Sequence, residues 1–187
     1  PTVGNAAKLS YYGTYRNLNR ENDRSKHFGI KTTPLHAYLQ QTERKSLLPI
    51  PSGILRRKGA ETTIDIHQHS IGDLYAGALS KSLRKMPQLE ILNLKGNGIK
   101  ERGAVKILKS IQVRNIKKIN LSDNHLGERS IALIIRLITT YGNKITEIGL
   151  ENTGLKNVYV AEIAEALTES RNIRTLNMSR NKLSDLT

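Results

Sequence analysis

The sequence predicts an α/β solenoid, a stack of repeats that each contribute one short strand and one helix. A block of about eleven residues recurs along the chain, at residues 61–71, 89–99, 116–126, 145–155 and 173–183. Each copy carries a marker residue at the same place, and the markers are spaced by 28, 27, 29 and 28 residues: His69, Asn97, Asn124, Thr153 and Asn181. Self-similarity at such a period is typical of solenoids, in which each repeat buries its apolar side against its neighbours.

Each block contains the pattern of a short strand with one buried side. Two apolar residues alternate there with polar ones, so both apolar side chains point the same way. These pairs are Ile64 and Ile66, Leu92 and Leu94, Ile119 and Leu121, Ile148 and Leu150, and Leu176 and Met178. We therefore expect one strand per repeat, stacked parallel to the next.

A helix is predicted after each of the first four strands, because apolar residues then recur every three or four positions. The inward faces are expected to consist of Leu74, Ala78, Leu79 and Leu83; Ala104, Ile107, Leu108 and Ile111; Ile131, Ile134, Ile135 and Ile138; and Val160, Ile163, Ala164 and Leu167. Three glycines, Gly72, Gly103 and Gly127, fall near helix entries, where we expect a tight turn after the strand.

The pattern Leu92-x-Leu94-x-x-Asn97-x-Ile99 and its equivalents resemble the leucine-rich repeat family, specifically its long-repeat, ribonuclease-inhibitor-like branch. The resemblance covers residues 61–187 and implies a leucine-rich-repeat solenoid, a horseshoe arc with strands on the concave face and helices on the convex face. It also implies a ladder of Asn side chains between repeats. His69 and Thr153 depart from Asn, so we expect the ladder to be weaker or completed differently there. The last repeat is expected to be incomplete.

Two segments precede the repeats. Residues 1–32 are polar and basic, which predicts an extended or flexible arm. In a sharper interpretation this arm is a docking peptide, with residues of the types that dominate interfaces: Tyr11, Tyr12, Tyr15, Arg16, Arg20 and Arg24. Residues 33–60 are predicted to form a capping helix and a basic turn. The helix begins with Thr33 as N-cap and Pro34 at the first helical position, and the turn carries the patch Arg56, Arg57 and Lys58.

The net charge of +14 is uneven, since residues 1–60 hold eleven Lys or Arg and three Asp or Glu. A basic excess indicates an acidic partner, which can be another protein, a nucleic acid or an anionic membrane surface. The chain has no cysteine, which favours an intracellular location and excludes Cys-based zinc sites and thiol catalysis. No stretch approaches the roughly 18 uncharged apolar residues of a membrane span.

Motifs for catalysis or ligand binding are scarce. Asp65, His67 and His69 lie on one face of the first strand, but these positions must be polar there, and no second cluster completes a metal site. The segment Gly96-Asn97-Gly98 lacks the third glycine of a dinucleotide loop. An open curved surface also lacks the enclosed cavity that catalysis usually requires. We therefore expect no enzymatic activity, no cofactor and no metal.

The concave strand face is the main candidate for binding. Its outward positions are polar and of mixed sign: Asp65, His67, Asn93, Lys95, Lys118, Asn120, Glu147, Glu151 and Asn177. Mixed columns suit a hydrogen-bonded protein contact better than a phosphate backbone, which favours uniformly basic columns.

Intracellular relatives in this branch often serve in large assemblies, including cytoskeletal and ciliary ones. The resemblance therefore implies a non-catalytic scaffold, a structural subunit that binds other proteins, acidic ones in particular, through this face and the N-terminal arm. Two alternatives stay open: a nucleic-acid-associated subunit of a ribonucleoprotein, and an inhibitor-like regulator of another protein.

Overall fold

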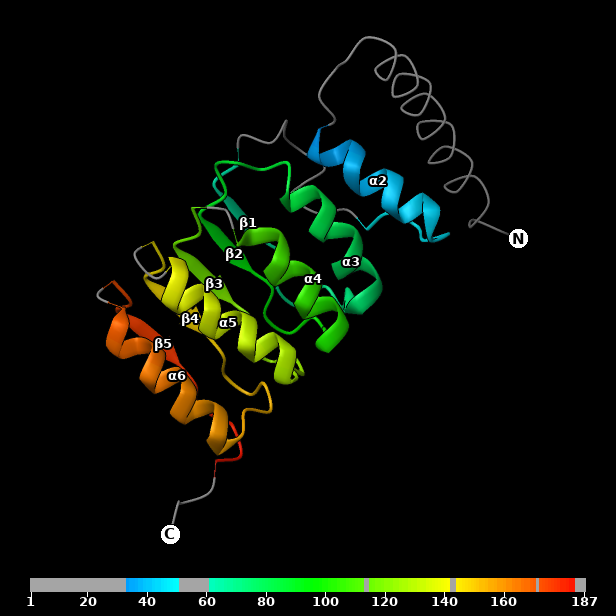
Figure 1. Cartoon of the computed structure of the whole chain (residues 1–187). Coiled ribbons are helices and arrows are strands. Elements are labelled where there is room, and N and C mark those ends of the chain that lie inside the picture. Colours follow the sequence, from blue (N-terminus) through cyan, green and yellow to red (C-terminus); the bar gives the residue numbers. More distant parts are fainter. Residues whose placement is uncertain (1–32, 51–60, 113–114, 142–143, 171, 184–187) are drawn as a thin grey trace.

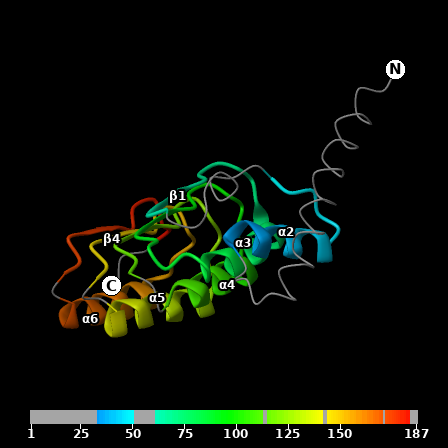
Figure 2. The same ribbon diagram turned by 90° about the horizontal axis from the view of Figure 1, so that it is seen from above.

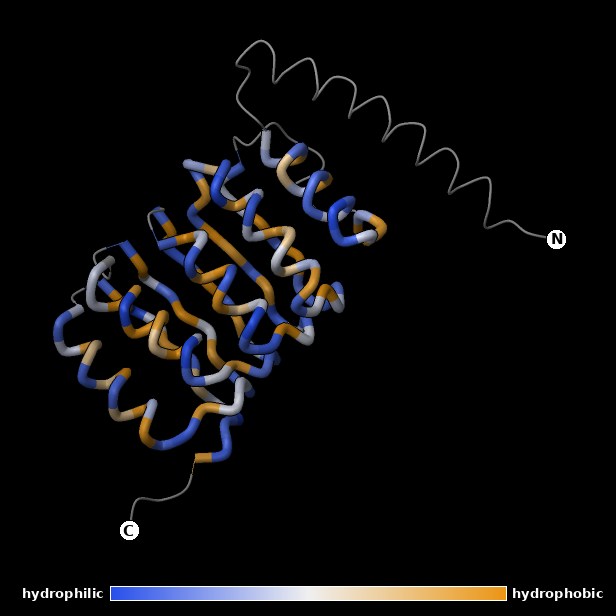
Figure 3. The backbone as a smooth tube through the Cα atoms, turned by 45° about the vertical axis from the view of Figure 1, so that its right-hand side comes forward, coloured by the Kyte–Doolittle hydropathy of each residue, from blue (hydrophilic) through white to orange (hydrophobic). Residues whose placement is uncertain are grey.

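The computed structural model of the protein describes residues 33–50, 61–112, 115–141, 144–170 and 172–183. These residues form two layers, a sheet of short strands and a row of helices that covers one side of it (Figures 1 and 2). Hydrophobic and hydrophilic stretches alternate along both layers (Figure 3). Strand and helix follow each other in sequence order, so the chain advances one repeat at a time.

The described strands make one parallel sheet in the order β1-β2-β3-β4-β5. Their bounds are Thr63–Asp65 for β1, Ile91–Asn93 for β2, Lys118–Asn120 for β3, Glu147–Gly149 for β4 and Thr175–Asn177 for β5. The register pairs equivalent repeat positions throughout; Ile64 pairs with Leu92, and Leu92 with Ile119. The predicted parallel stacking is confirmed.

Each of the first four strands is followed by a helix: α3 Gly72–Leu83, α4 Glu101–Ile111, α5 Glu128–Tyr141 and α6 Asn157–Glu169. A further helix, α2 Pro34–Arg44, precedes β1. The central residues of three strands, Leu92, Ile119 and Ile148, are no more than 3% exposed. Burying an aliphatic side chain of this size contributes about 1.5–3 kcal/mol, so stacked aliphatic layers between sheet and helices form the core.

Two residues that the helical pattern places inward lie on the surface instead. Leu74 of α3 is 60% exposed, and Ala164 of α6 is also exposed. In both helices the residue two positions further along, Ala76 or Ala166, is buried in its place. Both helices carry small or apolar residues on more than one side, so the sequence is compatible with more than one inward-facing side. The layer against which each helix packs determines which side is buried.

Helix α2 packs along α3 at the first-repeat end of the helix layer (Figure 1). The hydroxyl of Thr33 accepts a backbone N–H from the first turn at 3.2 Å, which confirms the predicted N-cap. Tyr38 and Leu39 are buried against Ala78 of α3. Ala78 is thus buried by α2, and α3 has a second buried side besides the one that faces the sheet. Helix α2 thereby covers apolar surface of the first repeat, as a terminal cap of a solenoid must.

Asparagine side chains join successive repeats at the turn that follows each strand. The carboxamide oxygen of Asn97 accepts the N–H of His69 at 3.0 Å, and its nitrogen donates to the carbonyls of Ile66 and Leu94 at 2.8 and 2.9 Å. Asn124 likewise accepts the N–H of Asn97 at 3.2 Å and donates to the carbonyl of Leu94 at 2.9 Å. Both amides are buried, so each one satisfies backbone groups of two repeats that water does not reach.

Thr153 completes this ladder by a different route. Its hydroxyl donates to the carbonyl of Leu150 at 2.9 Å, which reproduces the bond that Asn124 makes to Leu121 within its own repeat. The link to the preceding repeat is the main-chain bond from the N–H of Leu126 to the carbonyl of Thr153 at 3.0 Å, which corresponds to the bond from Gly72 to Asn97 at 2.9 Å. Among the described residues, the side-chain link that the asparagines add is missing at Thr153, so the ladder is weaker at this step, as the sequence allowed.

The residue before each marker residue has a left-handed backbone conformation. The φ angle is positive in all five repeats, between 49° and 66°: Gln68, Gly96, Asp123, Asn152 and Arg180. Gly, Asp and Asn tolerate this conformation readily, whereas Gln and Arg adopt it at a cost. Because the turn is the same in every repeat, the hydrogen bonds between repeats rather than local preference determine the backbone there.

A carboxylate in the first turn of one helix caps the start of the next helix. Asp73 of α3 accepts the N–H of Gly103 in α4 at 3.0 Å. Glu101 of α4 accepts the N–H groups of Gly127 and Arg129 at 2.9 and 2.8 Å, where α5 begins. The first N–H groups of a helix have no partner within it, and a negative charge beside them is also favoured by the helix dipole.

This contact corrects the expected role of two glycines. Neither Gly103 nor Gly127 has a positive φ; of the three glycines near helix entries, only Gly72 does, at 53°. A Cβ atom at Gly103 would lie 2.5 Å from the Asp73 carboxylate, and one at Gly127 would lie 2.6 Å from that of Glu101. Glycine is required at these two positions because the carboxylate of the preceding helix lies so close.

Replacing Asn97 by Ala is expected to lower the free energy of unfolding by about 2–4 kcal/mol, because several buried backbone groups lose their partners at once. Thr153→Ala is the matched control in the same ladder. It is expected to cost about 1 kcal/mol, since its link to the preceding repeat is made by the main chain. Urea denaturation of both variants measures the difference, and equal losses would contradict the ladder.

The capping carboxylate of Glu101 should make stability depend on pH. Burial raises the pKa of Glu101, but hydrogen bonds from the Ser130 hydroxyl and from the N–H groups of Arg129, Ser130 and Gly127 outweigh burial and hold its pKa below 4.5. A depressed pKa in the folded state contributes stability that is present above 4.5 and is lost as the pH falls through the lower folded value.

Glu101→Gln is therefore expected to reduce the free energy of unfolding by about 1–2 kcal/mol at neutral pH. The difference from the unmodified protein should shrink as the pH falls through the depressed folded pKa of Glu101, because protonation then removes the same charge. Glu128→Gln, an exposed first-turn acid of α5, serves as the control and should change stability by less than about 0.5 kcal/mol. A pH-independent effect at Glu101 would refute the capping role.

Candidate functional site

The outward-facing positions of the sheet form what we call the strand face, the side of the sheet away from the helices (Figure 2). Equivalent residues lie in columns because the strand register and the main-chain bonds after the strands join them. The columns are Thr63, Ile91, Lys118, Glu147 and Thr175; Asp65, Asn93, Asn120, Gly149 and Asn177; and His67, Lys95, Ser122, Glu151 and Ser179. All nine residues predicted for binding lie on this face, which is hollowed by a shallow depression of about 320 Å³.

An ion-pair network crosses four consecutive repeats on the strand face. The ammonium group of Lys95 lies 3.3 Å from the carboxylate of Asp123 and 3.4 Å from that of Glu151. Glu151 in turn lies 3.6 Å from the guanidinium of Arg180. Hydrogen bonds to Asp123 and Glu151 raise the pKa of Lys95, and a hydrogen bond from Asn152 together with Lys95 holds the pKa of Asp123 below its usual range despite burial. Lys95 thus has two carboxylate partners in the following repeats.

A second ion pair joins neighbouring strands, with Lys118 of β3 2.6 Å from Glu147 of β4. Both lysines predicted as contact residues, Lys95 and Lys118, thus already have carboxylate partners within the chain. The charges of the strand face largely neutralise one another, so this face offers no basic excess to an acidic partner.

The second column holds the turns in shape. Asn93, Asn120 and Asn177 each accept, through the side-chain oxygen, the N–H of the residue two positions later, at 3.0–3.2 Å. Asp65 does the same in the first repeat, at 3.2 Å. Polar residues at these positions therefore have a structural role besides any contact, because their oxygens accept backbone N–H groups.

Asp65, His67 and His69 do not converge on one point. The His67 ring nitrogen Nδ1 lies 2.6 Å from the Asp65 carboxylate, whereas Nδ1 of His69 bonds to the carbonyl of His67 at 2.7 Å. Burial raises the pKa of Asp65, but hydrogen bonds from the His67 ring and N–H outweigh it and lower that pKa. Among the described residues, no group of three or more His, Cys, Asp or Glu side chains is placed to hold a metal ion.

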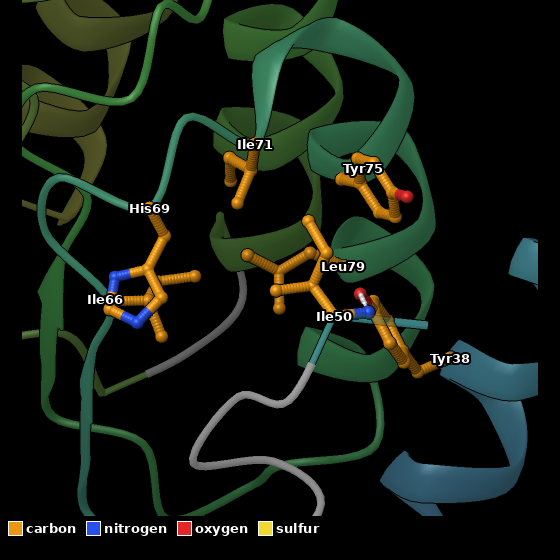
Figure 4. A pocket seen from close by; sticks show the side chains of 7 residues that line it. All are labelled: Tyr38, Ile50, Ile66, His69, Ile71, Tyr75 and Leu79. Atoms are coloured by element: carbon orange, nitrogen blue, oxygen red, sulfur yellow. Dashed lines mark hydrogen bonds between the residues drawn. The ribbon is translucent and has the colours of Figure 1, made fainter. Parts of the chain in front are cut away.

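His69 instead lines a small apolar hollow where α2 meets the first repeat. Figure 4 shows the side chains around it: Tyr38, Ile50, Ile66, His69, Ile71, Tyr75 and Leu79. The backbone N–H of Ile50 donates to the Tyr38 hydroxyl at 3.3 Å beside the hollow. With about 10 Å³ of space, the hollow holds one water molecule at most, so it is a packing gap at the capping helix rather than a ligand site.

Gly149 is the one position of the second column without a side chain. A Cβ atom there would lie 2.5 Å from Oδ1 of Asn120 and 3.1 Å from the hydroxyl of Ser122. That hydroxyl accepts the N–H of Glu151 at 3.1 Å. The missing side chain thus leaves room for the polar groups of the third repeat in the middle of the depression.

Two residues of the strand-face network are absent from the sequence-based candidate set. Asp123 and Arg180 follow the three predicted columns by one position, in the left-handed turn. Extending the column count by one residue would have included them. The docking arm of Tyr11, Tyr12, Tyr15, Arg16, Arg20 and Arg24 and the patch Arg56, Arg57 and Lys58 lie outside the described residues. In the portion that the structure describes, no helix is long and apolar enough to cross a membrane.

Gly149→Ala is expected to destabilise the protein by about 1–3 kcal/mol, because the new methyl group must displace Asn120 and Ser122 from their positions. Thr175→Ala, on the neighbouring strand β5 and exposed, is the control and should cost less than about 0.5 kcal/mol. Thermal unfolding of both variants tests the difference. A Gly149→Ala protein as stable as the control would show that the depression is not closely packed.

Comparisons with known proteins agree with this architecture. Residues 85–108 and 169–186 match the sequence model of the leucine-rich repeat family. FERM domain-containing protein C of Dictyostelium discoideum is 28% identical over 95 residues, which is 50% of this chain, and the chain spans 6% of the length of that relative. The solved structure of leiomodin-1 actin-binding site 2 is similar in fold, with a TM-score of 0.56 and 16% identity over 74% of this chain and 83% of that chain. Together with five parallel strands that alternate with helices, the family matches support a leucine-rich repeat protein.

Proposed function

We propose that this protein is a non-catalytic interaction scaffold, a structural subunit of a larger intracellular assembly that binds a protein partner through the strand face and the basic N-terminal arm. The observation that carries the proposal is the strand face itself. It is open, shallow and polar, with columns of side chains in register across five strands. Such a surface suits contact with another macromolecule better than the enclosure of a small substrate.

The rigidity of this surface favours selective binding. Lys95 and Lys118 are held by carboxylates, and the asparagines of the second column are held by backbone N–H groups. Side chains that are already ordered lose less conformational entropy when a partner binds. A partner with matching donors and acceptors therefore binds without first rearranging this face.

The fold similarity to leiomodin-1 actin-binding site 2 directs the proposal toward the cytoskeleton, and actin is the first partner to test. The match with a leucine-rich repeat family model supports a role in protein interaction in the same way. The likeness to the actin-binding site of leiomodin-1 supports the choice of actin, the family match supports only a role in protein interaction, and a binding measurement on this chain must decide the partner.

The test is a charge swap that leaves the fold intact. Lys118→Glu combined with Glu147→Lys keeps an ion pair across β3 and β4 and keeps the net charge, but it inverts the pattern that a partner meets. We expect the thermal stability to stay the same and the affinity for monomeric or filamentous actin, measured by fluorescence titration and co-sedimentation, to fall about tenfold.

A second swap, Lys156→Glu combined with Glu162→Lys, is the control. Both residues are exposed at or on α6, and the net charge is again unchanged. This variant should bind as the unmodified protein does. If actin binds equally well to both swapped proteins, the strand face is not the actin-binding surface, and if the unmodified protein does not bind actin, the choice of partner is wrong.

A further inference from the structure

Another hollow lies where the strands begin, separate from the strand face and from the small hollow beside α2. It has a volume of about 440 Å³ and runs past the residues that immediately precede β2, β3, β4 and β5. These are Glu90, Lys117, Thr146 and Arg174, one from each of four successive repeats. We call it the strand-start groove.

The floor of this groove is fixed by main-chain bonds between repeats. The N–H of Lys117 donates to the carbonyl of Glu90 at 2.7 Å, that of Thr146 to Lys117 at 2.7 Å, and that of Arg174 to Thr146 at 2.8 Å. The four residues therefore form a straight row at the spacing of parallel strands, about 4.8 Å from one to the next. The row is about 14 Å long, the length of four to five residues of extended chain.

A second row, two residues earlier in each repeat, forms the wall of the groove. Asn115, Lys144 and Asn172 line it. The ammonium group of Lys144 bonds to the side-chain oxygen of Asn115 at 2.8 Å. Polar amides and a cation thus lie beside the floor residues along the whole groove.

The charge of the groove is positive. Lys117, Lys144 and Arg174 contribute three cations, against one carboxylate from Glu90, which lies 2.8 Å from Lys117. In the part of the chain that the structure describes, the guanidinium of Arg174 has no ion-pair partner. The excess of cations over carboxylates makes the groove attractive to a negatively charged ligand. This contrasts with the strand face, where each lysine is matched by carboxylates.

We propose that the strand-start groove binds an extended acidic peptide segment of a partner protein. The cations are spread along a line rather than gathered at one point, which fits a row of carboxylates better than a single anion. Alternate side chains of an extended peptide lie about 6.6 Å apart on one side, within reach of long Lys and Arg side chains. The amide nitrogen of Asn115 can donate to a peptide backbone, and the Thr146 hydroxyl, which donates to the carbonyl of Lys117 at 3.2 Å, can accept from it.

The groove is less suited to nucleic acid. The carboxylate of Glu90 interrupts its cationic row, and none of the described residues that line it is aromatic, whereas single-stranded nucleic acids are bound by aromatic stacking together with continuous positive charge. The proposal is also independent of the strand-face function, because none of the groove residues belongs to the strand face.

The experiment uses the whole chain and a short peptide of alternating Glu and Ser with blocked ends. A carbodiimide joins peptide carboxylates to lysine amines in direct contact, and mass spectrometry locates the adducts. Lys144 should be modified at least about fivefold more than Lys156, an exposed lysine at the start of α6 in the same repeat, because charge complementarity brings the peptide to the groove. A peptide of alternating Gln and Ser should give no adducts.

Arg174→Glu should reduce the Lys144 adduct about fivefold, while Arg174→Lys should preserve it. Thermal unfolding verifies that both variants are folded. Equal modification of Lys144 and Lys156, adducts confined to the lysines of residues 1–32, or an unchanged Lys144 yield in Arg174→Glu would each overturn the proposal. So would an oligo-dT strand that removes the Lys144 adduct at lower concentration than the peptide itself, since the groove would then be a nucleic-acid surface.

Discussion

The asparagine in the turn after β2, β3 and β5, at Asn97, Asn124 and Asn181, is the interaction on which the rest of this structure depends. Its carboxamide bonds to its own repeat and to the one before it, so a single side chain determines both the turn and the distance between repeats. Asn181 shows the same arrangement at the other end, where its oxygen accepts three N–H groups of the fourth turn at 2.9–3.1 Å. Aliphatic burial stabilises the stack, but it is not directional. Where an asparagine is present, its amide bonds add directional links between equivalent positions of two repeats.

Regular stacking also determines the chemistry of the surfaces. Residues one repeat apart in sequence lie on adjacent strands about 4.8 Å apart, so a column of like charges would repel itself. On the strand face this is avoided by opposite charges in neighbouring repeats, as with Lys118 and Glu147. The strand-start groove keeps an excess of cations, because Thr146 separates Lys117 from Arg174 in its floor. Two surfaces of different electrostatic character thus arise from one repeated backbone.

Much of the fold and part of the site can be predicted from residue patterns. Alternating apolar residues identify the strands, and counting from the marker residues places all nine strand-face candidates correctly. The phase of α3 and α6 is less predictable, since Leu74 and Ala164 are exposed while Ala76 and Ala166 are buried. Alanine fits either inside or outside a helix, so only the layer against which the helix packs can select the inward face.

The sequence by itself determines the repeat, the order of the strands and the residues that belong to each column, because these follow from local alternation and a nearly constant period. Only the tertiary structure decides that Lys95 is shared by two carboxylates, that Gly127 makes room for Glu101, and that Thr153 is linked to the preceding repeat through the main chain. The physical reason is that hydrogen bonds and ion pairs act over short distances and in fixed directions. They form between residues some 28 positions apart, whose relative placement exists only after the repeats have stacked.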